Sequence, residues 1–106
     1  MNNKNNENYN ENELFILMVR VHISKPKRKT LLSLEYCCKM PSEIAKDVDE
    51  RINAISSALS YLKDNNLVYC MNEDFNKGRM YQITEKGKKV IKLLKERTNK
   101  LKEIKD

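Results

Sequence analysis

Residues 41–87 read PSEIAKDVDERINAISSALSYLKDNNLVYCMNEDFNKGRMYQITEKG, and this stretch decides the fold of the 106-residue chain. Pro41 predicts a helix start, because its fixed φ suits the first helical turn. We expect this helix to span 41–48 and a second helix to span 51–64. The second helix has one apolar stripe whose members are spaced three, four and three residues apart: Ile52, Ile55, Leu59 and Leu62.

Two short strands should follow the second helix. Asn65 and Asn66 can supply the left-handed residue that ends a helix. The strands are expected over 67–71 and 80–83, and their connection contains Gly78, which tolerates positive φ. Helix, helix, strand, turn and strand in this order predict a helix-turn-helix with a β-hairpin wing. That architecture is used mainly to read duplex DNA.

The segment after the wing should form a final helix. Thr84 can cap it and Glu85 suits its first turn, whereas Gly87 is an unusual interruption so early in a helix. Apolar residues then recur at the three- and four-residue steps typical of one half of a dimer seam: Val90, Leu94, Leu101 and Ile104. A lone helix of this length is marginal, so we expect residues 90–106 to dimerise. A Lys-rich surface helix is the alternative.

The N-terminal part divides into a polar arm and an apolar run. Residues 2–12 contain seven Asn and bury too little surface to offset ordering entropy, so we expect a disordered arm over 1–11. Asn10 can cap a helix that has Glu13 at its third position. The run LFILMV has no polar face and must be buried nearly all round if helical, which suggests a partner subunit; a strand is also possible. The residues expected to contact that partner are Leu14, Phe15, Leu17 and Met18.

A further helix is expected over 26–38, because Pro26 again fits a first helical turn. Its core-facing residues would be Leu31, Leu32, Leu34 and Cys38. The chain is thus predicted to be mainly α (α+β), with one winged helix-turn-helix domain over 12–89, a two-stranded wing and terminal dimerisation helices. At 106 residues it has room for one small core.

Positive charge is concentrated in two segments. Residues 20–30 carry five Lys or Arg and no acidic residue, and residues 77–106 carry eleven against four acidic residues. The intervening residues 31–76 carry four basic against eight acidic residues. Clustered positive charge favours a polyanionic partner, since each phosphate contact releases counterions. Solvated helix faces of a Lys-rich protein are the alternative interpretation.

The helix over 51–64 should read DNA with the face opposite its apolar stripe. Asn53 can bind an adenine edge, and Arg51 can bind a guanine edge or a phosphate. Small residues beside them let the helix enter a major groove. The residues expected on this face are Arg51, Asn53, Ala54, Ser56, Ser57, Ser60 and Tyr61.

Cations outside this helix can add contacts to double-stranded DNA. Lys77 and Arg79 flank Gly78 in the wing and can reach a minor groove or its phosphates. Lys27, Arg28 and Lys29 can bind further phosphates. Because cations are unfavourable at a helix N-terminus, the position of these three residues favours a functional reason over a structural one.

The chain resembles the winged-helix transcriptional regulators of the MarR/ArsR superfamily, especially its small archaeal members. The resemblance covers about residues 27–95 and is carried by 41–45 (PSEIA), 54–59 (AISSAL), 62–63 (LK), 66–68 (NLV), 78–81 (GRMY) and 83–87 (ITEKG). It implies a homodimer formed through terminal helices, a DNA-reading helix over 51–61 and a wing arginine at Arg79. Two residues depart from the pattern: Met40 stands where Ser or Thr is common, and Asn66 where Gly is common.

Other functions were weighed against DNA binding. Cys37, Cys38, Cys70 and His22 are candidate soft ligands for a thiol- or metal-responsive regulator, but they lack a metal-binding spacing, so we expect no metal and no cofactor. A single His, no nucleophile elbow and no phosphate-binding Gly loop argue against an enzyme. An odd number of cysteines, no secretory signal and no apolar run of about 20 residues predict a cytoplasmic protein outside the membrane. A winged-helix protein-interaction module is the main competitor, and the sequence identifies no small-molecule effector.

Overall fold

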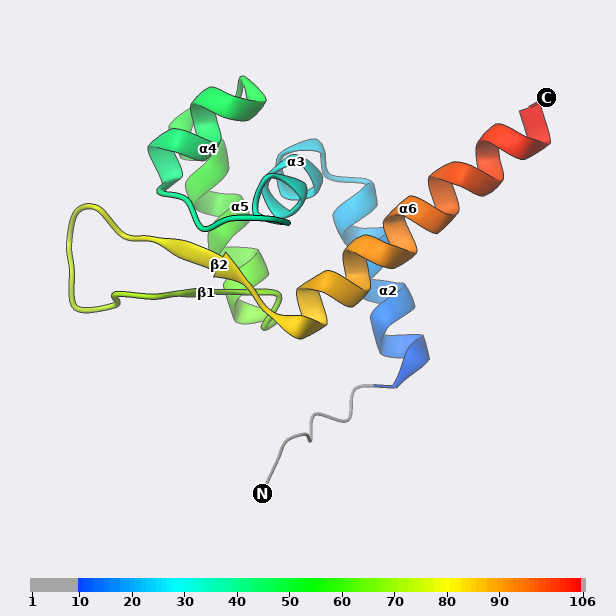
Figure 1. Cartoon of the computed structure of the whole chain (residues 1–106), viewed down its shortest axis with the longest axis horizontal. Helices are drawn as coiled ribbons and strands as arrows, with labels where there is room; N and C mark the ends of the chain where they lie inside the picture. Colours follow the sequence, from blue (N-terminus) through cyan, green and yellow to red (C-terminus); the bar gives the residue numbers. More distant parts are fainter. Residues whose placement is uncertain (1–9, 106) are drawn as a thin grey trace.

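The structure, a computed structural model, describes residues 10–105 and the side chains of residues 10–97. Its elements are α2 (Glu11–His22), α3 (Lys25–Ser33), α4 (Pro41–Val48), α5 (Ile52–Asp64), β1 (Val68–Cys70), β2 (Tyr81–Ile83) and α6 (Glu85–Lys105). Figure 1 shows α3, α4 and α5 gathered beside the hairpin, with α2 crossing α6 at the other end. The predicted α+β class and the winged helix-turn-helix order are confirmed. Residues 1–9 of the predicted arm fall outside the described residues.

The apolar run near the N-terminus is helical. The side chain of Asn10 accepts a hydrogen bond from the backbone N of Glu13 at 2.7 Å, so the predicted cap is present. One face of α2 is buried in the core, and it consists of Leu14, Leu17, Met18 and Val21. The other face is in solvent, where Phe15 is 52% and Ile16 51% exposed. The single chain thus covers one side of α2 only, and the expectation that a partner subunit covers the other side stays a prediction.

α3 ends at Ser33 instead of at the predicted residue 38. The chain then straightens, so that Lys39 pairs with Tyr81 at the free edge of β2. Lys39 N donates to Tyr81 O at 3.1 Å, and Tyr81 N donates to Lys39 O at 2.9 Å. A longer α3 would lose both hydrogen bonds, so a contact far along the chain determines where this helix ends.

The apolar stripe of α5 packs into the core, with one exception. Ile55, Leu59 and Leu62 are buried, and Ala58 is buried beside them. Ile52 is 46% exposed, contrary to the prediction. Ile52 is the first residue of the helix, so its side chain lies at the end of the core and not over it. The stripe therefore anchors α5 and leaves its first turn open.

β1 and β2 form an antiparallel pair in which Val68 lies opposite Ile83 and Cys70 opposite Tyr81. These four side chains are buried, whereas Tyr69 in the middle of β1 is exposed. This alternation is typical of a sheet with one face on the core and one in solvent. The strands are joined by residues 71–80, which we call the wing loop.

Gly87 allows α6 to approach the start of β1. A Cβ atom at Gly87 would lie 2.2 Å from the carbonyl oxygen of Leu67, closer than any side chain permits. Thr84 secures the same junction, because its Oγ1 accepts from Gly87 N at 3.0 Å and donates to Asn66 O at 2.7 Å. Asn66 has φ 63°, the left-handed conformation predicted after α5. The glycine that the sequence shows early in this helix is thus required for α6 to pack against Leu67.

Candidate nucleic-acid interface

Small and polar side chains form the outer face of α5. Arg51 is the N-cap residue, and the exposed side chains that follow are Asn53, Ser56, Ser57 and Ser60. Within the described part of the chain, no hydrogen bond or ion pair ties these five side chains to another residue. A ligand can therefore bind this face without first breaking a contact inside the protein.

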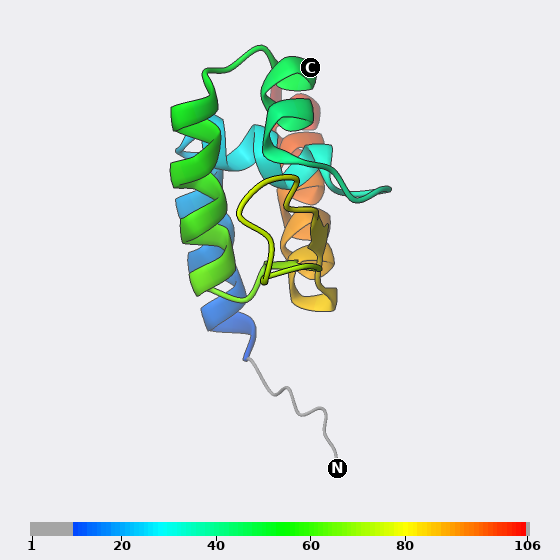
Figure 2. The same cartoon turned by 90° about the vertical axis from the view of Figure 1, so that its left-hand side faces the viewer.

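α5 and the wing loop are neighbours in the fold. Figure 2 shows α5 along one edge of the molecule with the wing loop next to it, and Lys63 of α5 binds Glu73 of the loop at 2.7 Å. Ala54 is half-buried at the margin of the face. Ile52 adds exposed apolar surface at the start of the helix. The sequence did not predict this exposure, because Ile52 belongs to the apolar stripe that was expected to face the core.

Tyr61 and Lys27 are engaged with each other inside the protein. The Nζ of Lys27 lies 3.6 Å from the centre of the Tyr61 ring, a cation–π contact that joins α3 to α5. The Tyr61 hydroxyl is buried and has no hydrogen-bond partner among the described residues. Tyr61 is therefore half-buried between two helices, although the sequence places it on the outer face.

The next two cations of α3 bind the C-terminal ends of neighbouring helices. The guanidinium of Arg28 donates to the carbonyl oxygen of His22, the last residue of α2. Lys29 Nζ donates to the carbonyl oxygen of Val48, the last residue of α4, at 3.1 Å. The final carbonyls of a helix carry partial negative charge, which a cation stabilises. The position of these cations thus has a structural reason, contrary to the interpretation of the sequence.

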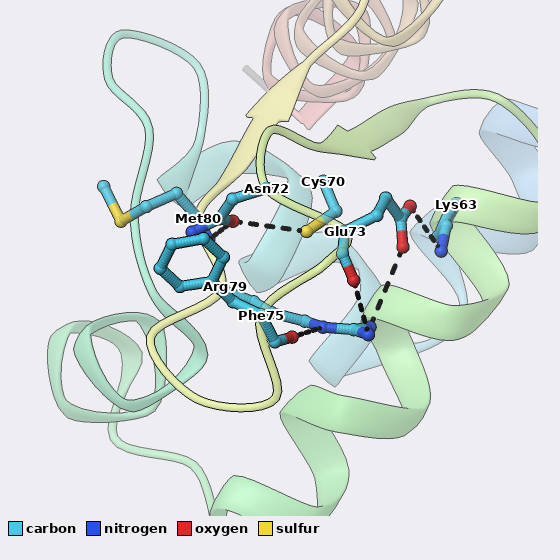
Figure 3. Close-up of polar contacts among 7 residues, drawn as sticks. All are labelled: Lys63, Cys70, Asn72, Glu73, Phe75, Arg79 and Met80. Carbon is cyan, nitrogen blue, oxygen red and sulfur yellow. Dashed lines mark hydrogen bonds and ion pairs between the residues drawn. The ribbon is translucent and has the colours of Figure 1, made fainter.

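Arg79 holds the wing loop together (Figure 3). Its Nε donates to Phe75 O at 2.6 Å, and its Nη2 donates to Glu73 O at 3.1 Å. The carboxylate of Glu73 also binds Lys63 in the last turn of α5, at 2.7 Å. The guanidinium that the sequence assigns to the minor groove is thus turned into its own loop. It shapes the wing and, through Glu73, connects it to α5.

Asn72 closes the base of the wing loop. Its Oδ1 accepts from Met80 N at 2.8 Å and from the Cys70 thiol at 3.5 Å, and its Nδ2 donates to Gly78 O at 3.1 Å. Gly78 has φ 70°, as its residue type predicts. Lys77 beside it is exposed and forms no ion pair with the described residues. Lys77 is therefore the cation of the wing that is available to a ligand.

The ion pair between Lys63 and Glu73 shifts the titration of both groups. The hydrogen bond from Lys63 lowers the pKa of Glu73 below its ordinary value. The same hydrogen bond raises the pKa of Lys63 above its ordinary value. Both groups are therefore charged over a wide range around neutral pH, and the link between α5 and the wing persists there.

Several acidic side chains around α5 are already paired with Lys. The pairs are Asp47 with Lys39 at 2.8 Å, Glu50 with Lys29 at 3.6 Å, and Glu73 with Lys63 at 2.7 Å. Lys39 and Lys63 already count among the four basic residues of 31–76, so only Lys29 offsets a negative charge of that segment from outside it. Asp74 in the wing loop is exposed and forms no ion pair among the described residues.

The residues expected at a dimer interface fall into separate groups. Those buried in the core of the single chain are Leu14, Leu17, Met18, Val90 and Leu94. Phe15 is exposed and lines an open groove of about 520 Å³ between α2 and α6, together with Leu93 and Lys89. The side chains of Leu101 and Ile104 fall outside the described residues.

The three cysteines are free thiols in two places, the connection after α3 and β1. Cys37 is exposed and Cys38 half-buried in the connection after α3, so Cys38 is not the core residue predicted, while Cys70 is buried in β1. Among the residues whose side chains are described, no three His, Cys, Asp or Glu form a group that could hold a metal ion. None of the helices in the described part of the chain has the length and hydropathy needed to cross a lipid bilayer.

Comparison with known proteins identifies the fold. No protein-family model matches the chain, and no curated protein sequence matches it significantly. TubR bound to 24 bp of tubC from Bacillus thuringiensis serovar israelensis pBtoxis has a TM-score of 0.71 at 8% identity, over 85% of this chain and 99% of that chain. A double mutant of Lactococcus lactis ZitR has a TM-score of 0.59 at 19% identity, over 73% of this chain and 51% of that chain. The apo form of that mutant has a TM-score of 0.58 at 16% identity, over 85% and 67% of the two chains. The chain thus shares the winged-helix fold of these proteins.

Proposed function

We propose that this chain is a sequence-specific DNA-binding transcriptional regulator that acts as a homodimer. The observation that carries the proposal is the outer face of α5, which is small, polar and free of contacts to other described residues, with the wing loop beside it. The fold is shared with TubR, whose structure contains 24 bp of duplex. A helix with such a face can enter a major groove, where base edges carry a distinct pattern of donors and acceptors.

The proposed base contacts lie near the start of α5. Asn53 binds an adenine edge through its amide, and Arg51 binds a guanine edge or the adjoining phosphate. Ile52 contacts a thymine methyl group, since it is the exposed apolar residue between them. Ser56, Ser57 and Ser60 donate to phosphates, and their small size lets the helix approach closely.

The proposed backbone contacts come mainly from Lys77 in the wing loop. Lys77 is exposed and unpaired among the described residues, so its ammonium can bind a phosphate without a competing carboxylate. Lys27, Arg28 and Arg79 act instead through the fold, since each is engaged with another part of the protein. In this proposal the α5 face contacts the bases, and the wing loop positions the protein on the DNA backbone.

The proposed dimer uses the open side of α2 and the adjoining part of α6. Phe15 and Ile16 are half-exposed there, and burying both between two copies removes apolar surface from water. A symmetric dimer places two α5 helices on one DNA molecule, so the binding site should be pseudo-palindromic.

The first test is a titration of purified protein against duplexes selected from a random pool, at two salt concentrations. The proposal predicts binding whose affinity falls steeply with salt, because phosphate contacts release counterions. Absence of salt-dependent binding would contradict it and favour a winged-helix module that docks other proteins.

A further inference from the structure

Phe75 is an apolar side chain in the middle of a polar loop. It is 57% exposed, and its sequence neighbours are Asp74, Asn76 and Lys77. It belongs neither to the hydrophobic core nor to the half-buried residues packed against that core. An exposed ring contributes little to folding, because apolar surface stabilises a protein only when it leaves water. The exposed ring is therefore available for a contact outside the fold.

The backbone that carries this ring is fixed at both ends. Phe75 N donates to Asn72 O at 3.0 Å, and Phe75 O accepts from Arg79 Nε at 2.6 Å. Arg79 also binds Glu73, which Lys63 connects to α5 (Figure 3). The backbone from which the ring extends is thus held at a set position relative to α5. A group that is already positioned loses little conformational freedom when it binds.

The wing loop lies where the groove next to α5 would run. α5 and the loop lie next to each other, so a duplex with α5 in its major groove brings the adjoining backbone or minor groove near the loop. Apolar wedges such as Phe can enter a minor groove between two base pairs and unstack them, which kinks the duplex. Lys77, close by in the sequence and exposed, can bind a phosphate beside the opened step.

We propose that Phe75 is such a wedge, and that the protein bends the DNA it binds. This inference rests on the proposed DNA-binding function and adds to it a second way of reading sequence. Pyrimidine–purine steps such as TA or CA unstack most easily, so the wedge favours one of them at the position below the wing loop. α5 reads base edges, while Phe75 reads how easily the duplex deforms.

The experiment uses the full chain and a duplex enriched from a random pool, with a fluorophore pair at its ends and 2-aminopurine at the candidate step. The parent protein should shorten the end-to-end distance by a bend of about 20° or more and raise the 2-aminopurine fluorescence. Phe75→Ala should bind within about tenfold of the parent affinity but lose both signals, because lost stacking is offset by avoided unstacking. Phe75→Leu should keep the bend, since Leu is also an apolar wedge.

Met71→Ala is the matched control, because Met71 is a wing-loop residue that is 52% exposed. It should bend DNA as the parent does. If the parent leaves the bound duplex straight, or if Phe75→Ala bends it fully, the wedge is overturned and DNA binding stands. Equal loss of the bend in Met71→Ala would also contradict a specific role of Phe75. A parent that binds no duplex overturns the wedge together with the proposed function.

Discussion

Lys63, in the last turn of α5, holds the wing loop through Glu73, with 2.7 Å between Lys63 Nζ and Glu73 Oε2. The backbone oxygen of Glu73 accepts a hydrogen bond from Arg79, which in turn holds Phe75. One chain of contacts thus runs from the helix that presents the polar face to the loop beside it. The two parts of the candidate interface are positioned together.

Replacing Glu73 with Gln should lower the thermal unfolding temperature at neutral pH, and the difference should disappear in acid. Lys63 lowers the pKa of Glu73 in the folded protein. The carboxylate therefore contributes its full stability above the ordinary Glu pKa of about 4.3, and this contribution is lost as pH falls through the lower folded value. Thermal unfolding of both proteins over this range measures the difference. Asp74→Asn, which removes an unpaired neighbour, should show no comparable change with pH, and a Glu73→Gln deficit that persists in acid would contradict the charge-based explanation.

The two glycines should respond to Ala for different reasons. Gly87→Ala should destabilise the protein by about 3 kcal/mol or more, because the new Cβ would lie 2.2 Å from the Leu67 carbonyl oxygen and the backbone must shift. Gly78→Ala should cost only about 1 kcal/mol, since space is open there and positive φ is the only obstacle. Urea unfolding measures both changes. Equal costs would mean that α6 does not approach β1 as closely as described.

Substitutions of Lys29 and Lys77 should have different effects, because Lys29 stabilises the fold and Lys77 is proposed to bind DNA. Lys29→Ala should lower the free energy of unfolding by about 0.5 to 1 kcal/mol, because it removes the cation at the C-terminus of α4. Lys77→Ala should leave stability within about 0.5 kcal/mol of the parent but reduce the salt dependence of DNA binding by about one phosphate contact. Urea unfolding and salt titration of both variants give the comparison. A weaker salt dependence in Lys29→Ala without loss of stability would assign Lys29 to phosphate binding instead.

Phe15→Lys should convert the proposed homodimer to a folded monomer. Phe15 is half-exposed in the single chain, so a charged residue there is tolerated in the monomer but not in an apolar interface. Sedimentation equilibrium should show half the parent mass with an unchanged circular dichroism spectrum. Tyr36→Lys replaces an aromatic residue that is 86% exposed in the connection before α4, and it should sediment like the parent. A Phe15→Lys protein that sediments as a dimer would place the interface elsewhere.

Apolar spacing predicted most of the helix-turn-helix correctly. α4 has the predicted bounds, and α5 begins one residue later than expected. These helices could be predicted because Pro41 and the spacing of the core residues are local signals in the sequence. The end of α3 was not predictable in this way. It depends on the pairing of Lys39 with Tyr81, and nothing near Lys39 in the sequence reveals that partner.

The candidate site was predictable for the face of α5 but not for the wing. Asn53 and the serines are exposed because they lie opposite the core stripe, which the sequence shows directly. Arg28 contacts a residue of another helix, and Arg79 contacts a residue across the wing loop. The sequence does not show these contacts. It shows only the positive charge of the two residues, which suggested DNA binding. Phe75 was missed because an aromatic residue in a loop has no periodic pattern that shows whether it is buried or exposed.

Selection of bound duplexes from a random pool, carried out in parallel for the parent and for Asn53→Ala, tests the central claim most directly. The parent should enrich a pseudo-palindromic sequence, and the variant should lose preference at one position of each half-site, at a cost of about 1 to 3 kcal/mol for the preferred base. Failure of the parent to enrich any sequence, or identical enrichment by both proteins, would contradict the claim that the outer face of α5 reads DNA.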